Sequence, residues 1–338
     1  MSTQSPELVP GPTPEKTTSQ PIRRVGTLWR RILAFLIDTI ILAFIGGLVA
    51  WPFTNTLIAL GPGGRLVGYF VALLYFAVPE SNIGSGASLG KRLLLLQVVH
   101  ADGSMLTIEE SLIRYTVFAA PYFLNALPLP MSRTPTVMSL LLGLIVYGAG
   151  GVTCYLILFN RNTRQGLHDL AAKCFVAEAD KRGAITHKPI WRLHWAFAGA
   201  LFLGLGLDAG AIFAVLSYSG TAAKWMDDIR VLEQLDGVQK AGFVVAWKGG
   251  LRSGIPASLT ITIRCNCHED DEEGLADEAA KALIENDQGL QQYPVIHIVV
   301  MRGYDIGIAS HWTSQRFSDS PAGWNLRLFG NPSVPATE

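Results

Sequence analysis

Long runs of apolar residues alternate with short basic loops over the first two thirds of the chain. A bilayer core of about 30 Å is crossed by roughly 20 apolar residues in helical conformation. By this measure the pattern predicts five membrane spans, at residues 32–53, 66–78, 111–130, 136–159 and 193–218. The third is the weakest, because it contains Arg114, Pro121 and Asn125.

The loops between these spans set the expected orientation. Lysine and arginine in short loops mark the cytoplasmic side of a membrane protein. They gather before the first span, after the second and after the fourth, whereas the other loops hold only Arg65 and Arg133. If residues 111–130 cross the membrane, the N-terminus is cytoplasmic and the C-terminal part lies outside. If that segment only dips into the bilayer, the C-terminal part is cytoplasmic instead.

The chain beyond residue 219 has a different pattern. It holds 10 Lys+Arg and 16 Asp+Glu, against 17 and 11 in residues 1–219. Apolar alternation typical of strands and the one-sided apolar spacing of a helix follow one another in the order β-β-α-β-β. The predicted elements cover residues 241–249, 257–265, 270–287, 293–301 and 305–317, with the last turn at Arg302-Gly303-Tyr304. We therefore predict a mainly α-helical polytopic membrane protein with a C-terminal α+β domain.

Two shorter segments complete the organisation. Residues 89–100 are too short for a span and are followed by Asp102-Gly103, a hairpin signal, so we expect a strand at the cytoplasmic interface. Residues 170–179 are its expected partner. The tail is rich in proline, threonine and serine and is predicted to be disordered. The predicted domains are the tail at 1–21, a membrane domain at 22–180, a linker and fifth helix at 181–219, and an extracytoplasmic domain at 220–338.

Composition supports a membrane protein and offers little catalytic chemistry. Only 16% of the residues are charged and 49% are hydrophobic, whereas soluble domains have about 25% charged residues. Cys265 and Cys267 are interpreted as strand residues, without a disulfide framework or a metal site. No nucleophile elbow, phosphate-binding loop or zinc-protease motif is found. We therefore predict no enzyme, cofactor, metal or nucleic-acid partner, and the bilayer itself as the main partner.

Ionisable residues inside the spans are the candidate functional groups, because such residues usually face the bundle interior. Arg31 and Asp38 share one face of the first span but lie about 10 Å apart along the axis, so each needs another partner. Arg114 is a candidate partner for Asp38. A structural pair and a proton- or cation-binding role for Asp38 both stay open.

Asp208 lies in the middle of the fifth span. Gly206, Gly210 and Ala214 form a row of small residues there, which favours close helix packing over a ligand path. Asp208 is then expected to face another helix or a second copy of the chain, so a homo-oligomer is one expectation.

Three sequence blocks resemble the RDD membrane proteins of bacteria. They are RRILAFLID in the first span, GASLGKRLLLLQVVHADG after the second and RQGLHDLAAKCFVA after the fourth, and together they cover roughly residues 22–180. The arginine and aspartates that name the family match Arg31, Asp38 and Asp169. The glycines and the lysine of the middle block match Gly86, Gly90 and Lys91. The resemblance implies a polytopic fold in the bacterial plasma membrane, and transport of ions or other ligands has been suggested for this family.

The position of Asp169 adds a structural expectation. It lies in the basic cytoplasmic loop, on the same side as Arg31, and a charge-assisted pair would hold that loop against the base of the first span. Two functions stay open. One is transport or gating of a small ion or solute. The other is a non-transporting anchor, scaffold or sensor whose outer domain binds an envelope protein or a small ligand.

Overall fold

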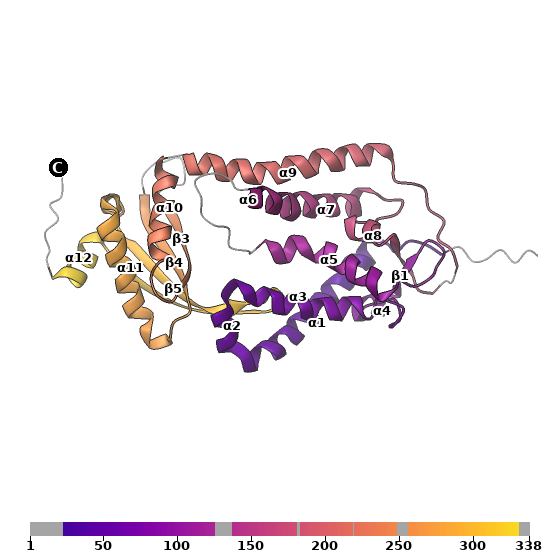
Figure 1. Ribbon diagram of the computed structural model, residues 1–338, viewed down its shortest axis with the longest axis horizontal. Coiled ribbons are helices and arrows are strands. Elements are labelled where there is room, and N and C mark those ends of the chain that lie inside the picture. Colours follow the sequence, from indigo (N-terminus) through magenta and orange to yellow (C-terminus); the bar gives the residue numbers. More distant parts are fainter. Residues whose placement is uncertain (1–22, 126–136, 181–182, 219, 249–255, 331–338) are drawn as a thin grey trace, which may run out of the picture.

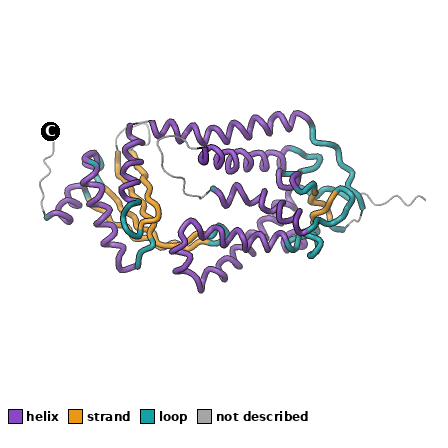
Figure 2. The backbone as a smooth tube through the Cα atoms, in the orientation of Figure 1, coloured by secondary structure: helices purple, strands orange, loops and turns teal. Residues whose placement is uncertain are grey.

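The computed structural model describes residues 23–125, 137–180, 183–218, 220–248 and 256–330. The molecule is elongated, and its longest helices run along the long axis (Figure 1). A two-stranded sheet lies at one end and a four-stranded sheet with its helices lies at the other (Figure 2). The structure therefore has a helical N-terminal region and a sheet-containing C-terminal domain, as predicted.

The helical region is built from apolar segments that bury one narrow face each. The buried positions of the first helix recur every four residues, at Ala34, Asp38, Leu42, Gly46 and Ala50, which is one stripe of an α-helix. The helical elements are α1 (Leu28–Ala50), η1 (Trp51–Phe53), α2 (Thr54–Leu60), η2 (Gly61–Gly63), α3 (Gly64–Ala77), α4 (Leu89–Leu93), α5 (Ile108–Leu124), α6 (Val137–Gly143), the π-helical η3 (Leu144–Ala149), α7 (Gly150–Phe159), α8 (Leu167–Ala171) and α9 (Arg192–Tyr218).

Two described helical stretches are long and apolar enough to cross a membrane. They are Leu28–Ala77, in which α1 and α3 run in opposite directions along the long axis (Figure 1), and Leu140–Phe159. A shorter apolar stretch, Arg192–Leu207, belongs to α9. α5 has 17 residues and contains charged residues, so its role as a span stays a prediction.

The small sheet joins two distant parts of the helical region. Strands β1 (Leu96–His100) and β2 (Cys174–Glu178) pair antiparallel, which is the pairing expected between residues 89–100 and 170–179. The inward side chains, including Leu96 and Val176, pack against Ala34 of α1. This contact ties the loop after α7 to the start of α1.

The C-terminal domain is a four-stranded sheet covered by helices. Its elements are α10 (Gly220–Leu232), β3 (Val238–Trp247), β4 (Pro256–Cys265), η4 (Glu269–Asp271), α11 (Glu272–Asn286), η5 (Gln288–Gln292), β5 (Ile296–Asp305), β6 (Ser310–Asp319) and α12 (Pro321–Phe329). The strand order is β3-β4-β5-β6, with β4 and β5 parallel and the other pairs antiparallel. Because parallel neighbours need a crossover, α11 connects β4 to β5 and packs Leu275 and Leu283 on the sheet.

The last hairpin turns later than the sequence predicted. Gly303 lies inside β5, where a Cβ atom would stand 2.1 Å from the carbonyl oxygen of His311, so this glycine permits close strand approach. The turn lies at residues 306–309, where Asp305 Oδ1 accepts a hydrogen bond of 2.7 Å from the Gly307 amide and Gly307 has a φ of +82°. An Asx-type bond with a left-handed glycine is a stronger turn signal than an isolated glycine.

Cys265 and Cys267 form a disulfide, which corrects the interpretation of these residues as strand residues without a disulfide. β4 ends at Cys265, so the chain no longer has to keep the full extended spacing between the two positions. Their Cα atoms are 5.3 Å apart, within the usual range for a disulfide.

The tip of the β5–β6 hairpin docks against the helical region. Ile306 is completely buried and packs with residues of α1 and α2. Ile308 packs against this apolar cluster and against a second one that α1, α3 and α5 form. Arg65 Nη2 lies 2.7 Å from Asp305 Oδ2. The Tyr122 hydroxyl donates a hydrogen bond of 2.6 Å to the carbonyl of Gly307. The C-terminal domain is thus attached through a specific apolar and ionic contact as well as through the chain.

Candidate functional site

Asp38 is fully buried and is held by neutral donors. Its Oδ1 accepts hydrogen bonds from the Tyr75 hydroxyl at 2.6 Å and from the Gly90 amide at 2.8 Å. Its Oδ2 accepts one from the Ser88 hydroxyl at 2.6 Å. Within the described part of the chain, Asp38 has no ion pair, so the expected partnership with Arg114 is wrong. Arg114 is held elsewhere by two other carboxylates.

Glycine at position 90 makes this arrangement sterically feasible. A Cβ atom on Gly90 would lie 2.3 Å from the carbonyl oxygen of Ala34 and 2.9 Å from the Asp38 carboxyl carbon. Only a residue without a side chain lets α4 approach α1 closely enough for its amide to reach the carboxylate. This explains the position of Gly90 in the motif.

A row of five alternating charges lies beside Asp38. Arg114 donates through Nε and Nη2 to Asp169 Oδ1, at 3.0 and 2.7 Å, and through Nη1 to Glu80 Oε2. Lys91 Nζ pairs with the other oxygen of Glu80. At the opposite end, Arg31 Nη2 lies 2.8 Å from Asp169 Oδ2, which brings together the two residues expected to pair. The order is Lys91–Glu80–Arg114–Asp169–Arg31, called the ionic chain below.

Glu80 is the member of the ionic chain that sequence reasoning missed. It follows Pro79 at the end of the second apolar run, where a carboxylate is normally interpreted as a solvated loop residue. One signal was present, because Glu80 is the only acidic residue between Asp38 and Asp102. In the structure it is 1% exposed.

The Asp38 site and the ionic chain are contiguous. Lys91 Nζ lies 3.4 Å from the Ser88 hydroxyl, which in turn donates to Asp38. The three cations of the ionic chain pair with the carboxylates of Glu80 and Asp169, while Asp38 reaches the chain only through the Ser88 hydroxyl. Removing one member leaves an unbalanced buried charge, which is far more costly than losing a surface ion pair.

Three residues in the segment after α7, His168, Asp169 and Cys174, have strongly shifted pKa values. Burial lowers the pKa of His168 to about 3, so its imidazole is neutral at physiological pH. Burial alone would raise the pKa of Asp169, but the positive charges of His168, when protonated, Arg114 and Arg31 outweigh it and hold that pKa well below its usual range. Burial also raises the pKa of Cys174 to about 12. At neutral pH the two arginines alone therefore balance the Asp169 carboxylate.

Among the other residues predicted for the site, Gly86 and Gly206 have roles in loop geometry and helix packing. Gly86 has a φ of +72° in the loop before α4, and its carbonyl accepts a hydrogen bond of 2.7 Å from the Val98 amide of β1. A Cβ atom on Gly206 would stand 2.5 Å from Leu144 Cδ2 of η3, so this glycine packs within the chain. The side chains of Asp208, Gly210 and Ala214 lie outside the described residues.

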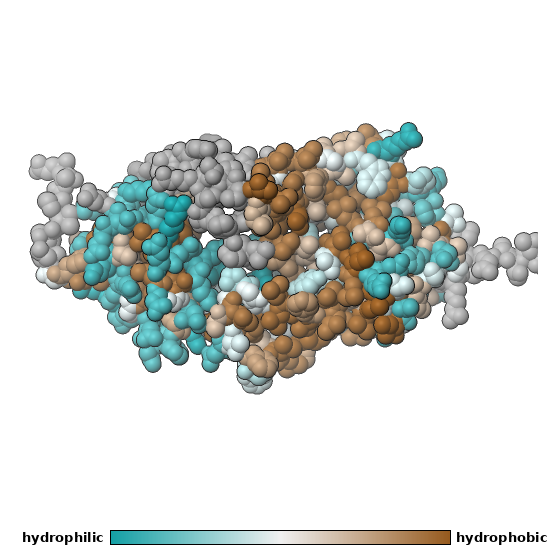
Figure 3. Space-filling model, in the orientation of Figure 1, coloured by the Kyte–Doolittle hydropathy of each residue, from teal (hydrophilic) through white to brown (hydrophobic). Residues whose placement is uncertain are grey.

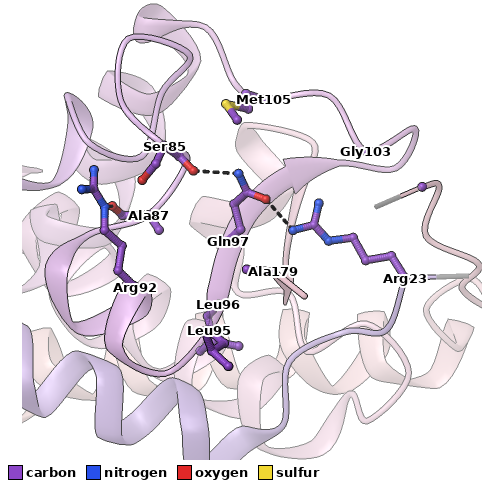
Figure 4. A pocket seen from close by; sticks show the side chains of 11 residues that line it. Arg23, Ser85, Ala87, Arg92, Leu95, Leu96, Gln97, Gly103, Met105 and Ala179 are labelled. Carbon is purple, nitrogen blue, oxygen red and sulfur yellow. Dashed lines mark hydrogen bonds between the residues drawn. The ribbon is translucent and has the colours of Figure 1, made fainter. Parts of the chain in front are cut away.

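A surface hollow of about 680 Å³ lies beside the two-stranded sheet (Figure 4). Its polar side chains bind one another and the nearby backbone. Gln97 Nε2 donates to the Ser85 carbonyl at 2.7 Å, and Gln97 Oε1 accepts from Arg23 Nη2 at 2.6 Å. Arg92 Nε donates to the carbonyl of Ala87 at 3.1 Å. These bonds rigidify the connection between the chain before α1 and β1.

The RDD family model matches residues 25–173. Comparison with curated proteins found no match, and comparison with solved structures found none. The match includes Asp38 and the whole ionic chain, and it ends before α9 and the C-terminal domain. Together with the apolar helices, it indicates a membrane location. Residues 25–173 therefore form an RDD-family region within this chain.

Proposed function

We propose that this protein is a multi-pass protein of the bacterial plasma membrane that transports or gates a small cation or solute through its RDD bundle. The surface supports the membrane placement. An apolar band covers the helical region, whereas hydrophilic residues gather over the C-terminal domain (Figure 3). Trp29 and Trp51 are 78% and 79% exposed. They stand 22 helical positions apart, roughly 33 Å, close to the thickness of a bilayer core with its interfacial aromatic residues.

Five helical passes along one axis support the proposed topology. α1, α3, α5, α6–α7 and α9 follow the long axis in turn, and the C-terminal domain lies at the end opposite the two-stranded sheet (Figure 1). The disulfide between Cys265 and Cys267 is the kind of bond that persists in oxidising compartments outside the cytoplasm. Both observations favour a cytoplasmic N-terminus and an extracytoplasmic C-terminal domain.

We predict that a reporter enzyme active only outside the cytoplasm gives signal when fused after Glu338. The physical reason is the odd number of passes. The same reporter fused after Asp180 should be silent, whereas a cytoplasm-only fluorescent reporter should be bright there. A bright cytoplasmic reporter at Glu338 would remove α5 from the set of spans.

Asp38 carries the proposal of transport. A carboxylate that merely fastens helices together is expected to face a cation, because an unpaired buried charge is expensive. Asp38 instead meets two hydroxyls and one backbone amide. A hydroxyl group that donates to a carboxylate can rotate, so that its oxygen and the carboxylate together bind a cation. Alternatively, a proton on the carboxylate would remove the buried negative charge. We infer that Asp38 exchanges a proton or a small cation during the cycle.

The test is flux through purified protein in liposomes, with ΔpH and Na⁺ or K⁺ gradients read by pH- and cation-sensitive dyes. Asp38→Asn keeps the size of the side chain and should fold normally. Its flux should fall at least about tenfold, because a neutral amide cannot exchange a proton or a cation as a carboxylate does. Asp38→Glu should retain part of the flux. The exposed carboxylate Glu109 provides a matched control, since Glu109→Gln should leave flux unchanged.

A different result would exclude this role for Asp38. If Asp38→Asn is folded and fully active, the carboxylate is structural. If the unmodified protein shows no flux with any ion, the anchor function described next replaces transport.

The second candidate function is a membrane anchor that holds the outer domain in a fixed pose. The docked hairpin favours it, since Ile306, Ile308 and the Arg65–Asp305 pair fasten the domain to the helices. Under this function an envelope protein or small ligand binds the outer domain. Crosslinking in intact cells should then capture the same partner with Asp38→Asn as with the unmodified protein.

A further inference from the structure

A cleft opens on the side of the ionic chain opposite its carboxylates. Its volume is about 330 Å³, and it lies between α1, α5 and α7. Its walls are apolar and include Phe35, Phe118, Ile157 and Leu158. Phe35 and Leu158 are each 46% exposed, so the cleft opens to the apolar outer surface of the helical region, where the acyl chains of a bilayer would lie.

The base of the cleft is cationic. Arg31, Lys91 and Arg114 line it, together with His168, whereas Glu80 and Asp169 do not. The side chains of the three cations keep 10%, 14% and 9% of their surface accessible, while those of Asp169 and Glu80 keep 0% and 1%. The carboxylates are thus hidden behind the cations, and what the cluster presents to a ligand is positive.

A second observation at the same place also indicates a ligand. His168 is buried, and its Nδ1 has no hydrogen-bond partner among the described residues. Buried polar atoms are nearly always satisfied. Nε2 of the same ring lies 3.3 Å from Asp169 Oδ1, so the neutral imidazole carries its proton there, and Nδ1 is free to accept a hydrogen bond from a hydroxyl of a bound molecule.

The geometry points to an anionic phospholipid of the cytoplasmic leaflet as the occupant of this cleft. Its phosphodiester would lie against Arg31, Lys91 and Arg114, and one acyl chain would follow the wall formed by Phe35, Phe118 and α7. Charge-assisted contacts to phosphate oxygens are among the strongest hydrogen bonds in proteins. The lipid is thereby a structural ligand of the RDD region. This inference rests on the proposed membrane placement but is independent of transport.

Cys154 gives a direct readout of occupancy. It lines the cleft and is exposed, whereas Cys174 is buried and Cys265 is bonded to Cys267. A maleimide should therefore react first at Cys154, and Cys154→Ser should abolish that labelling. The experiment uses full-length protein stripped of lipid in neutral detergent. Three additions are compared: mixed micelles of phosphatidylglycerol, mixed micelles of phosphatidylcholine, and inorganic phosphate in solution.

We expect phosphatidylglycerol to slow the labelling of Cys154 by about tenfold relative to phosphatidylcholine, a preference equal to roughly 1.4 kcal/mol. Phosphatidylcholine carries the same acyl chains, but its choline cation opposes the cationic base. Ile157→Trp fills the wall of the cleft without touching the ionic chain and should remove the protection. Phe159→Trp changes an exposed residue of α7 outside the cleft and should preserve it.

Equal protection by both lipids would overturn the proposal and leave ordinary boundary lipid. Protection by inorganic phosphate alone would overturn it in favour of a small-anion site. A protein that shows no ion flux but keeps selective protection would lose the transport function and retain the lipid site, so the two failures are distinguishable.

Discussion

Asp169→Ala should destabilise the protein by about 3–5 kcal/mol, the range for removing one partner of a buried ion pair. Asp169 is completely buried and is the shared acceptor of Arg31 and Arg114. Without it, two guanidinium groups face each other across an empty site, and only Glu80 still balances Arg114. The loss combines desolvation of both cations with their mutual repulsion.

Chemical denaturation in mixed micelles, followed by tryptophan fluorescence, measures this change in the free energy of unfolding. Glu109→Ala removes an exposed carboxylate from the first turn of α5 and should cost no more than about 1 kcal/mol. The double variant Arg31→Ala with Asp169→Ala should be less destabilised than the sum of the two single variants, because it removes one unbalanced charge. Strict additivity would mean that the pair between them contributes nothing.

Gly68→Ala should release the hairpin tip of the C-terminal domain from the helices. A Cβ atom at this position would lie 1.7 Å from the carbonyl oxygen of Ile306. The obstacle is backbone, so no side-chain rotation relieves it. Displacing the tip exposes Ile306 and loosens Ile308, and each buried isoleucine contributes about 1.5–3 kcal/mol. We expect the docked state to lose about 3 kcal/mol on this basis.

Hydrogen exchange across residues 305–310 measures the release. A loss of about 3 kcal/mol corresponds to roughly a hundredfold faster exchange of the docked amides. Gly47→Ala is the matched control, since it is also a helical glycine but a Cβ atom there meets nothing within 4 Å. It should leave exchange unchanged and add up to about 1 kcal/mol of helix stability. Unchanged exchange in Gly68→Ala would show that the hairpin is not docked in solution.

The Asp38 site and the docked hairpin contact the same face of α1. Asp38 and Gly46 lie two turns apart on the buried stripe of α1, and a Cβ atom on Gly46 would stand 2.9 Å from Ile308 of the hairpin. A shift of α1 at one contact is therefore felt at the other, because packed interfaces transmit displacement. This gives a physical route by which the outer domain bears on the RDD site under either proposed function.

Much of the organisation could be predicted from local patterns. Apolar run length separated the helical region from the C-terminal domain, and alternation with turn signals predicted the order β-β-α-β-β. The Asp102-Gly103 signal located the end of the small strand that pairs with β2. These features depend on neighbouring residues, whose periodicity is written directly in the chain. The partnership of Arg31 with Asp169 was also within reach, because both match charged residues that name the family and both lie on the predicted cytoplasmic side.

Only the tertiary structure decided which groups hold Asp38 and where the hairpin docks. Ser88, Tyr75 and the Gly90 amide carry no charge to mark them, and hydroxyls and amides are common throughout the sequence. Glu80 looked like a loop carboxylate until Arg114 and Lys91 were placed on both sides of it. Gly68 and Gly47 are both glycines within apolar helices. Of the two, only Gly68 lies against the backbone of a distant segment, at Ile306. Such roles arise from contacts between residues far apart in the chain, and periodicity along one helix contains no information about what packs against it.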